Sequence, residues 1–427
     1  MEQEGERKFG RFLIVWVGQF ISNIGSGLTA FSLGVYAFQK TGSAISYSLI
    51  ILFAFLPSFL LKPIGGTLSD RMDRRLMMII GDIGSAFGLV FILLMLFSGI
   101  DDLWQIYIGV AISSVFVALQ NPAYKASVTD LLDKNSYSKA SGLMQLSESS
   151  RFLISPILAG ILLGFMNIKY VLIIDILTFL VAVLAVFSIK RNLNKQKSNE
   201  KQEHFFNDLK SGFKYTFSQK GLLYLLCITS LITFSIGFLQ TLIGPMILVF
   251  TDSKTLGITL TVAATGMLIS SFLIGIFSKT NKQVKILCIS LFFAGFFYAL
   301  LGVSTNIVFI IGSGFLFFFI LPFVNTSLDV LIRTNVENDM QGRVWSIVSL
   351  ISQFGMVIAF SIAGFLADNV FNPLFQTDGF FASTIGKIIG TGRGRGIGFM
   401  FILSGITVTI IAVLISKIKT IRRLGKQ

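Results

Sequence analysis

The placement of lysine and arginine along an otherwise apolar chain constrains the fold more than any other feature. Each apolar run is long enough to cross a hydrocarbon core of about 30 Å, which takes about 20 residues of helix. When alternate connections are assigned to the cytoplasm, starting with the N-terminus, most of the 35 Lys and Arg residues lie on the inner side. This bias follows the positive-inside rule and predicts an even number of spans with both termini in the cytoplasm. Hydropathy indicates twelve runs, at roughly 12–38, 44–69, 75–98, 103–130, 137–165, 167–190, 221–250, 256–279, 284–304, 306–333, 341–367 and 397–417.

The composition indicates an all-α membrane protein. Hydrophobic residues make up 53% of the chain and charged residues 13%, and the mean hydropathy is +0.79. An open sheet could not satisfy its backbone in lipid, and the runs lack the short alternating strands of outer-membrane barrels. We therefore expect a multi-pass helical bundle that acts as a monomer in the lipid bilayer of a bacterial plasma membrane.

The charged and reactive residues favour neither an enzyme nor a nucleic-acid-binding protein. The net charge of +14 comes from cations at short inner loops, where anionic lipid headgroups attract them. Cys227 and Cys288 lie inside apolar runs, and His204 is the one histidine. No metal, cofactor or catalytic residue is therefore expected. The glycine-rich tract 390–396 lacks the Gly-Lys-Ser/Thr ending of a phosphate-binding loop.

A polar segment at 191–220 divides the chain into two bundles of six helices, 1–190 and 221–427. Phe205, Leu209, Phe213 and Phe217 recur every four residues within it, which predicts an amphipathic helix on the inner membrane surface. The two halves also repeat. A shift of 200 residues places Pro122 on Pro322, Ser127 on Ser327 and Gly142 on Gly342. These identities indicate two parallel six-helix pseudo-repeats, the second of which carries an outer insertion at 369–396.

The connection between the second and third runs carries a sequence signature. The tract Gly65-Gly66-Thr67-Leu68-Ser69-Asp70-Arg71-Met72-Asp73-Arg74-Arg75 resembles the G-x-L-x-D-R-x-x-R-[RK] motif of the major facilitator superfamily. Gly66 would let two helices approach closely, and Arg71, Arg74 and Arg75 can pair with acids such as Asp130. The resemblance implies that Asp70 lies against the positive N-terminal end of the eleventh helix. The tract would then form a cytoplasmic latch; the alternative is a basic loop that only sets the orientation of the chain.

Further segments resemble the macrolide-efflux branch of that superfamily over nearly the whole chain. They are Trp16–Gln19, Asn121–Ala123, Ser155-Pro156 with Ala159-Gly160, Asp175, Gly342–Val344 with Ser346, and Gly364–Asp368. The resemblance implies the twelve-helix fold of that superfamily and a drug exporter that works by alternating access. The chain departs from the branch at 369–396, and Ser155 replaces the glycine that usually precedes proline in the antiporter motif.

Ionisable residues within the apolar runs are candidates for proton coupling, because charges inside the bilayer are costly. Glu148 and Arg151 are three residues apart, so they share a helix face and could pair. Asp175 is a second candidate proton carrier. For each of these residues a purely structural role is the alternative. Polar side chains that could line a central cavity are Gln19, Asn23, Gln145, Gln240, Asn325 and Gln353.

These features predict a secondary active transporter that exports hydrophobic or amphipathic small molecules such as macrolide-like drugs. The proton gradient would drive it, since the sequence shows no nucleotide-binding motif. One alternative is a siderophore, lipid or metabolite transporter of the same fold. Another is a non-transporting membrane sensor or scaffold.

Overall fold

The computed structural model describes residues 2–133, 136–188, 205–277 and 282–424, and these residues form helices and connections with no strand. Twelve of the helical segments in this part of the chain are long and apolar enough to cross a membrane, which confirms the predicted number of spans. The chain divides into two compact units. The first comprises Met1–Gly42, Ser46–Glu200 and Ser253–Ile258, and the second comprises Ser43–Ile45, Lys201–Asp252 and Thr259–Gln427.

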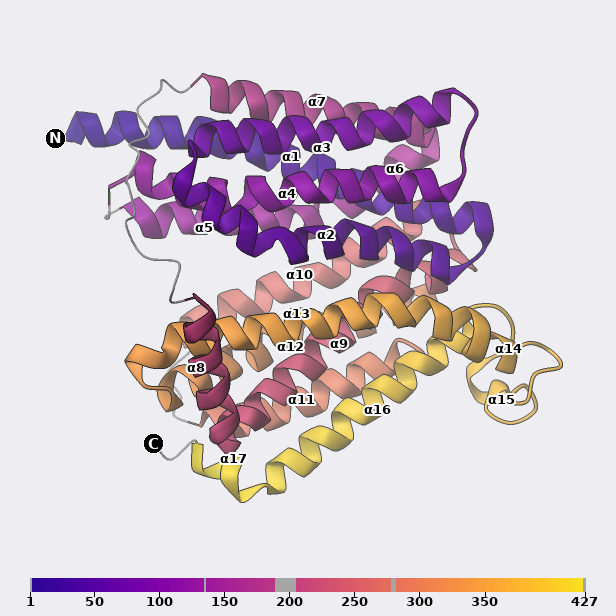
Figure 1. Ribbon diagram of the computed structural model, residues 1–427. Coiled ribbons are helices and arrows are strands. Elements are labelled where there is room, and N and C mark those ends of the chain that lie inside the picture. The colour runs from indigo at the N-terminus through magenta and orange to yellow at the C-terminus, as the bar shows by residue number, and fades with distance from the viewer. Residues whose placement is uncertain (1, 134–135, 189–204, 278–281, 425–427) are drawn as a thin grey trace. The chain divides into compact units, whose positions relative to one another are not determined.

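The helices of the first unit run alongside one another and are joined by short connections (Figure 1). Asp73 and Asn167 begin two of these helices by accepting hydrogen bonds from backbone N–H groups of the first turn. The helices are α1 (Glu2–Thr41), α2 (Ala44–Arg71), α3 (Arg74–Phe97), α4 (Leu103–Leu131), α5 (Tyr137–Leu153), α6 (Ser155–Phe165) and α7 (Ile168–Phe187).

The fifth span, predicted as one run at 137–165, consists of two helices. Pro156 lies in the first turn of α6 and has no backbone N–H to donate to the preceding turn. The helix is therefore interrupted at Ile154, although the two pieces still cover one span from Tyr137 to Phe165.

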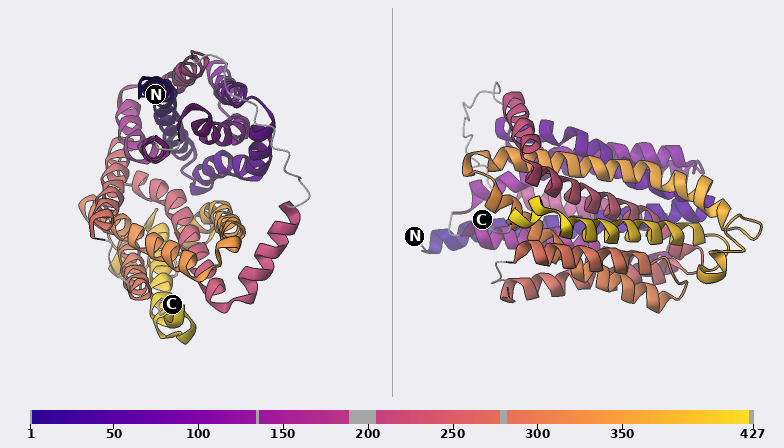
Figure 2. Two further views of the ribbon diagram at one scale, coloured as in Figure 1. Left: turned by 90° about the vertical axis from the view of Figure 1, so that its left-hand side faces the viewer. Right: turned by 90° about the horizontal axis from the view of Figure 1, so that it is seen from below.

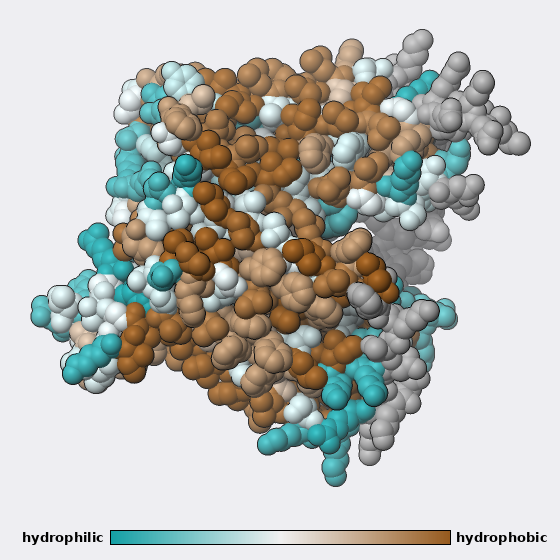
Figure 3. Space-filling view, turned by 180° about the vertical axis from the view of Figure 1, so that it is seen from behind, coloured by the Kyte–Doolittle hydropathy of each residue, from teal (hydrophilic) through white to brown (hydrophobic). Residues whose placement is uncertain are grey.

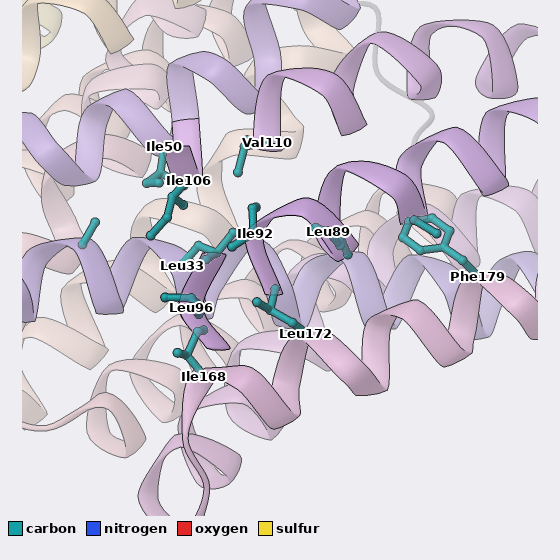
Figure 4. Close-up of a cluster of buried hydrophobic side chains, with 12 residues drawn as sticks. Leu33, Ile50, Leu89, Ile92, Leu96, Ile106, Val110, Ile168, Leu172 and Phe179 are labelled. Atoms are coloured by element: carbon teal, nitrogen blue, oxygen red, sulfur yellow. The ribbon is translucent and has the colours of Figure 1, made fainter. Parts of the chain in front are cut away.

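Apolar side chains from five helices form a core in the first unit (Figure 4). Leu33 of α1, Ile50 of α2, Ile92 of α3, Ile106 of α4 and Leu172 of α7 are each at most 2% exposed. Helix α1 packs against α7, α7 packs against α3, and α3 packs against α4, and these helices carry the polar groups described below.

The second unit contains the remaining long helices and one short helix that runs in another direction. Helix α8 crosses the ends of α9 and α13 instead of running beside them (Figure 2). The helices are α8 (Phe205–Ser218), α9 (Lys220–Leu248), α10 (Ser253–Phe277), α11 (Gln283–Leu300), α12 (Ile307–Asn335), α13 (Asn338–Leu366), α16 (Arg395–Lys417) and α17 (Lys419–Leu424).

Helix α8 has a buried and an exposed side over the residues whose side chains the structure describes. Gly212 and Thr216 face the protein, and a Cβ atom at Gly212 would lie 3.0 Å from the Arg343 carbonyl oxygen. Phe213 and Phe217 are exposed, with ring centroids 5.8 Å apart. The side chains of Phe205 and Leu209, which belong to the predicted pattern, lie outside the described residues.

The segment predicted as an insertion at 369–396 is partly helical. Helix α13 continues through a π-helix (η3, Ala367–Phe371) and α14 (Asn372–Leu374), and the short α15 (Gly386–Ile389) precedes α16. Phe375 is wholly buried between Phe381 and Phe399, at ring-centroid distances of 5.7 and 5.2 Å. This aromatic cluster gives the segment a small core of its own.

The surface of the described chain is apolar over its spans. Figure 3 shows one face on which hydrophobic residues dominate and hydrophilic residues gather toward the ends of the helices. Large apolar side chains such as Phe87, Phe165 and Phe272 are 63 to 84% exposed. Such continuous apolar exposure is not found on soluble monomers, and together with the twelve spans it marks a multi-pass membrane protein.

Candidate functional site

The basic loop between α2 and α3 is tied to the first unit by its arginines. Arg74 Nη1 lies 2.8 Å from Asp130 Oδ1, and it also donates to the Ala126 carbonyl at 2.8 Å. Both side chains of this ion pair are largely buried, at 20% and 16% exposure. The sequence proposed Asp130 as a partner of the loop, and the structure brings these two residues together near the end of α4.

Arg75 binds a different helix end. Its guanidinium donates to the carbonyl oxygens of Val186 and Phe187 at the end of α7, and it lies 5.1 Å from the Phe187 ring centroid. Cations are favourable at a helix C-terminus because the last carbonyls carry partial negative charge. Arg71 is exposed, and the side chain of Asp70 lies outside the described residues. The proposed contact of Asp70 with the eleventh helix therefore stays a prediction.

The close approach expected at Gly66 occurs at Gly65 instead. A Cβ atom at Gly65 would lie 2.0 Å from the Ala118 carbonyl oxygen of α4, whereas one at Gly66 would meet nothing within 4 Å. Pro122 has no N–H, so it cannot bond the carbonyl four residues earlier, which belongs to Ala118. The glycine Cα–H group can approach this free carbonyl oxygen, a weak but recurrent contact between helices.

A chain of buried polar groups links three helices of the first unit. Gln19 Nε2 of α1 donates to Asp82 Oδ2 of α3 at 3.0 Å, and Gln120 Nε2 of α4 donates to Gln19 Oε1 at 2.6 Å. Gln19 is 3% exposed and Asp82 is 2% exposed. This corrects the prediction that Gln19 lines an open cavity, because its face of α1 is covered by α3 and α4.

The predicted pair between Glu148 and Arg151 is also corrected. Glu148 Oε1 lies 2.9 Å from Lys125 Nζ of α4, so its partner is on the neighbouring helix and not on its own. Both side chains of this pair are exposed, at 58% for Lys125 and 46% for Glu148. An exposed ion pair contributes little to stability, so the pair is of interest for where it lies and not for the stability it adds.

The pair lies in a groove between α4 and the first part of α5. The volume of the groove is about 350 Å³, within the range of small-molecule sites. Both helices contribute polar and apolar side chains to it. The lining residues are Lys125, Val128, Thr129, Tyr137, Ser141, Met144, Gln145 and Glu148. Of the six predicted cavity residues, Gln145 is in this lining.

Two more charged residues lie where α5 and α7 pack on α1. Asp175 of α7 is 1% exposed, and its Oδ1 atom accepts a hydrogen bond from the Thr178 hydroxyl at 3.2 Å. A Cβ atom at Gly25 would lie 2.6 Å from that same oxygen, so the carboxylate rests on the α1 backbone. Arg151 of α5 is partly accessible, and the charge of Asp175 acts on it.

The other predicted cavity residues are dispersed. Asn23 Nδ2 of α1 donates to the Ser147 hydroxyl of α5 at 2.8 Å. In the second unit, Gln353 donates to Ser349 of its own helix, Gln240 is half-buried and Asn325 is exposed. The described structure does not gather these side chains into one site.

Sequence reasoning missed Lys125 as the partner of Glu148 and Gln120 as the partner of Gln19. Lys125 is one turn from Thr129 on α4, and both line the groove. The available signal was that the helix extends to Leu131, beyond Lys125, so that Lys125 lies on α4. Nothing in the sequence alone shows that Gln120 faces Gln19.

Comparison with known proteins decides the family. A family model described as Major Facilitator Superfamily matches residues 15–360. The chain belongs to the Major Facilitator Superfamily. Within this superfamily it falls in the macrolide-efflux-like branch, since Macrolide efflux protein A of Streptococcus pyogenes is 25% identical over 425 residues, covering 97% of each chain. The Staphyloferrin A transporter of Staphylococcus aureus is 26% identical over 376 residues, covering 83% of this chain and 90% of the relative.

Solved structures of major facilitator proteins share the fold. The crystal structure of the nucleoside transporter NupG has a TM-score of 0.76 and 13% sequence identity, and the match covers 96% of this chain and all of NupG. A bacterial homologue of the lysosomal transporter Spinster has a TM-score of 0.72 at 12% identity, covering 96% of each chain. At these identities the likeness concerns the fold and not the substrate.

Proposed function

We propose that this major facilitator protein is a secondary active exporter of amphipathic small molecules, such as macrolide-like drugs, and that it works by alternating access. The groove between α4 and α5 carries this proposal. It offers a volume of about 350 Å³ lined by both apolar and polar side chains, which suits a ligand with both kinds of surface. The likeness to Macrolide efflux protein A over 97% of both chains supports an exporter.

Protons are the proposed coupling ion. The first unit holds two carboxyl groups deep in its spans, Asp82 and Asp175, each at most 2% exposed. A permanent charge at such a position is costly, so a carboxyl group that gains and loses a proton during the cycle suits it. Glu148, paired with Lys125 in the groove, is exposed and can exchange its proton or its partner directly with water or substrate.

The Arg74–Asp130 pair is proposed as part of the inner latch. Its two partners lie on separate elements, at the start of α3 and the end of α4, and both are largely buried. Removing one partner of a buried pair is strongly destabilising because the other charge is left unpaired. Replacing one partner by another leaves no charge unpaired. A change of partner during transport would therefore stabilise two arrangements of the same loop.

The orientation proposed is that of the positive-inside rule, with both termini in the cytoplasm of a bacterium and the chain in the plasma membrane. The α2–α3 loop and α8 would then lie on the inner side. The bilayer and the transported molecule are the partners that this function requires.

A second candidate is a carrier for a siderophore, lipid or metabolite. The 26% identity to the Staphyloferrin A transporter over most of both chains favours the siderophore. A sensor or scaffold that does not transport would have no need for a groove with a charged pair in it.

The test is efflux from cells that overexpress the protein, measured with a panel of macrolides and hydrophobic dyes, with and without a protonophore. The proposal predicts efflux that the protonophore stops. If the protein is folded in the membrane and exports no member of the panel, the drug-exporter proposal fails and the siderophore, lipid or metabolite carrier replaces it.

A further inference from the structure

Arg151 is a charged residue in the middle of a membrane span. It lies midway along the fifth span, Tyr137–Phe165. The acid expected to pair with it, Glu148, binds Lys125. Among the residues that the structure describes, no group makes a hydrogen bond or an ion pair with the Arg151 guanidinium. An arginine side chain keeps its charge and has five N–H donors to satisfy.

The immediate surroundings hold the arginine stem but not its charged end. The Cγ atom of Arg151 packs against α1, where a Cβ atom at Gly27 would lie 3.0 Å from it. Asp175 is the carboxylate whose charge acts on Arg151, and its Oδ1 atom is already bonded to Thr178. The position therefore combines a fixed stem with free donor groups.

Arg151 is partly exposed. Charged side chains inside a membrane span face the interior of the bundle or a water-filled cavity and not the lipid. Met144 and Glu148, which line the groove, precede Arg151 by seven and three residues and so lie on its face of the fifth span. Glu148, which lines the groove, is therefore about 4.5 Å from Arg151 along the helix axis.

Charge within the groove favours an anion at this end. Lys125 and Glu148 neutralise each other at 2.9 Å. Asp175 acts on Arg151 through its charge but makes no hydrogen bond with it among the described residues, so the guanidinium donors can bind a further anion. Val128, Met144 and Tyr137 supply apolar surface along the way. An arginine binds a carboxylate through two parallel hydrogen bonds, and this geometry is specific for such planar anions.

We propose that Arg151 binds the carboxylate of an amphipathic organic acid whose apolar part lies in the α4–α5 groove. This inference rests on the proposed function, because it takes the groove to be part of the transport path, and it adds amphipathic organic acids to the expected substrates.

The first test measures the local electrostatic potential and needs no substrate. Cys227 and Cys288, which are free, are replaced by serine, and a reporter cysteine is introduced as Gln145→Cys. Its rates of modification by an anionic sulfonatoethyl and a cationic trimethylammonioethyl methanethiosulfonate are then compared. Arg151→Gln should lower the anion-to-cation rate ratio about fivefold, as expected for a unit charge about 9 Å away in water. Arg151→Lys should preserve the ratio.

Ser141→Cys is the matched control, since it lines the same groove about 15 Å from Arg151 along the helix. Its ratio should change less than that of Gln145→Cys when Arg151 is replaced. An unchanged ratio at Gln145→Cys, or no modification there by either reagent, overturns the proposal, because the site then has no positive potential or no water.

The second test measures binding to the purified protein in lipid nanodiscs by fluorescence anisotropy. The probes are carboxyfluorescein, an anion, and tetramethylrhodamine methyl ester, a cation built on a related ring system. Arg151→Gln should weaken carboxyfluorescein binding at least about tenfold, as for a lost charge-assisted hydrogen bond, and should not weaken binding of the cation. Equal carboxyfluorescein affinity in the wild type and in Arg151→Gln contradicts the assignment.

The two proposals fail in distinguishable ways. If Arg151 governs labelling and binding but no gradient drives transport, the exporter proposal fails and the anion site remains. If gradient-driven transport occurs and Arg151→Gln changes neither labelling nor anion binding, the anion site fails and the exporter proposal remains.

Discussion

Adjacent glycines in the α2–α3 motif should respond in opposite ways to the same substitution. Gly65 lies against α4, where an added Cβ atom would be 2.0 Å from the Ala118 carbonyl oxygen. Gly66 has nothing within 4 Å of the same added atom. Gly65→Ala and Gly66→Ala therefore form a matched pair that differs in one feature, the distance to the neighbouring helix.

The magnitude follows from the two positions. Alanine is favoured over glycine by up to about 1 kcal/mol inside a helix, so Gly66→Ala should be neutral or slightly stabilising. At Gly65 the ordinary contact distance begins at 3.4 Å, so α2 and α4 must move apart by more than an ångström. Overpacking of this kind costs about 1–3 kcal/mol. Both glycines lie inside α2 and gain the same helix propensity from alanine, so the two variants should differ by the overpacking cost, about 1–3 kcal/mol in the free energy of unfolding.

The assay is unfolding of each purified variant, followed by the temperature midpoint in the same detergent or nanodisc. Gly65→Ala should unfold at a clearly lower temperature than the wild type, and Gly66→Ala at the same or a higher one. Equal stability of the two variants, or a less stable Gly66→Ala, would refute the assignment of the close approach to Gly65.

Three further predictions concern charges of the first unit. Arg74→Gln and Asp130→Asn should each destabilise the protein by about 1–3 kcal/mol. In a double-mutant cycle of unfolding free energies, the double variant should lose less stability than the sum of the two single variants. Additive losses would show that the 2.8 Å pair contributes nothing. Asp82→Asn, which keeps a side chain able to bond Gln19, should retain the folded protein but lose the dependence of export on the proton gradient, whereas unchanged gradient-driven export would remove Asp82 from the coupling scheme. The hydrogen bond from Lys40 holds the pKa of Asp101 below its ordinary value. Its contribution to stability is therefore present above about pH 4 and is lost as the pH falls through the lowered pKa. The unfolding temperature of Lys40→Gln should fall less on acidification than that of the wild type, and equal slopes would contradict this.

Much of the architecture could be read from the sequence because the bilayer imposes simple rules. A span needs about 20 apolar residues, and lysine and arginine mark the inner loops, so twelve spans were predictable to within a few residues. The Arg74–Asp130 pair was also predictable, since the motif places arginines at the start of α3 and the fourth run ends beside an acid.

Side-chain partners were less predictable because they depend on how each helix is rotated about its axis. Glu148 and Arg151 are compatible with a pair along α5, but the rotation of α5 turns Glu148 toward Lys125 and Arg151 toward Gly27. Neighbouring residues on a helix point about 100° apart, so the rotation of α2 decides which glycine faces α4. The sequence predicted Gly66 at this contact, whereas Gly65 lies there.

Buried polar groups were the hardest to place. Gln19 looks like a cavity residue in the sequence because it is polar within an apolar run. The structure shows that its amide bridges Asp82 and Gln120 inside the first unit. A hydrogen-bond network of this kind requires three helices to meet, and no local pattern encodes that meeting.

Proton-driven export through this fold can be measured in proteoliposomes that contain the purified protein and an imposed pH gradient. A transported amphipathic probe should accumulate against its own concentration gradient while the proton gradient lasts, and a protonophore should abolish the accumulation. Transport that only equalises the probe across the membrane, unaffected by the proton gradient, would show that export is not proton-driven.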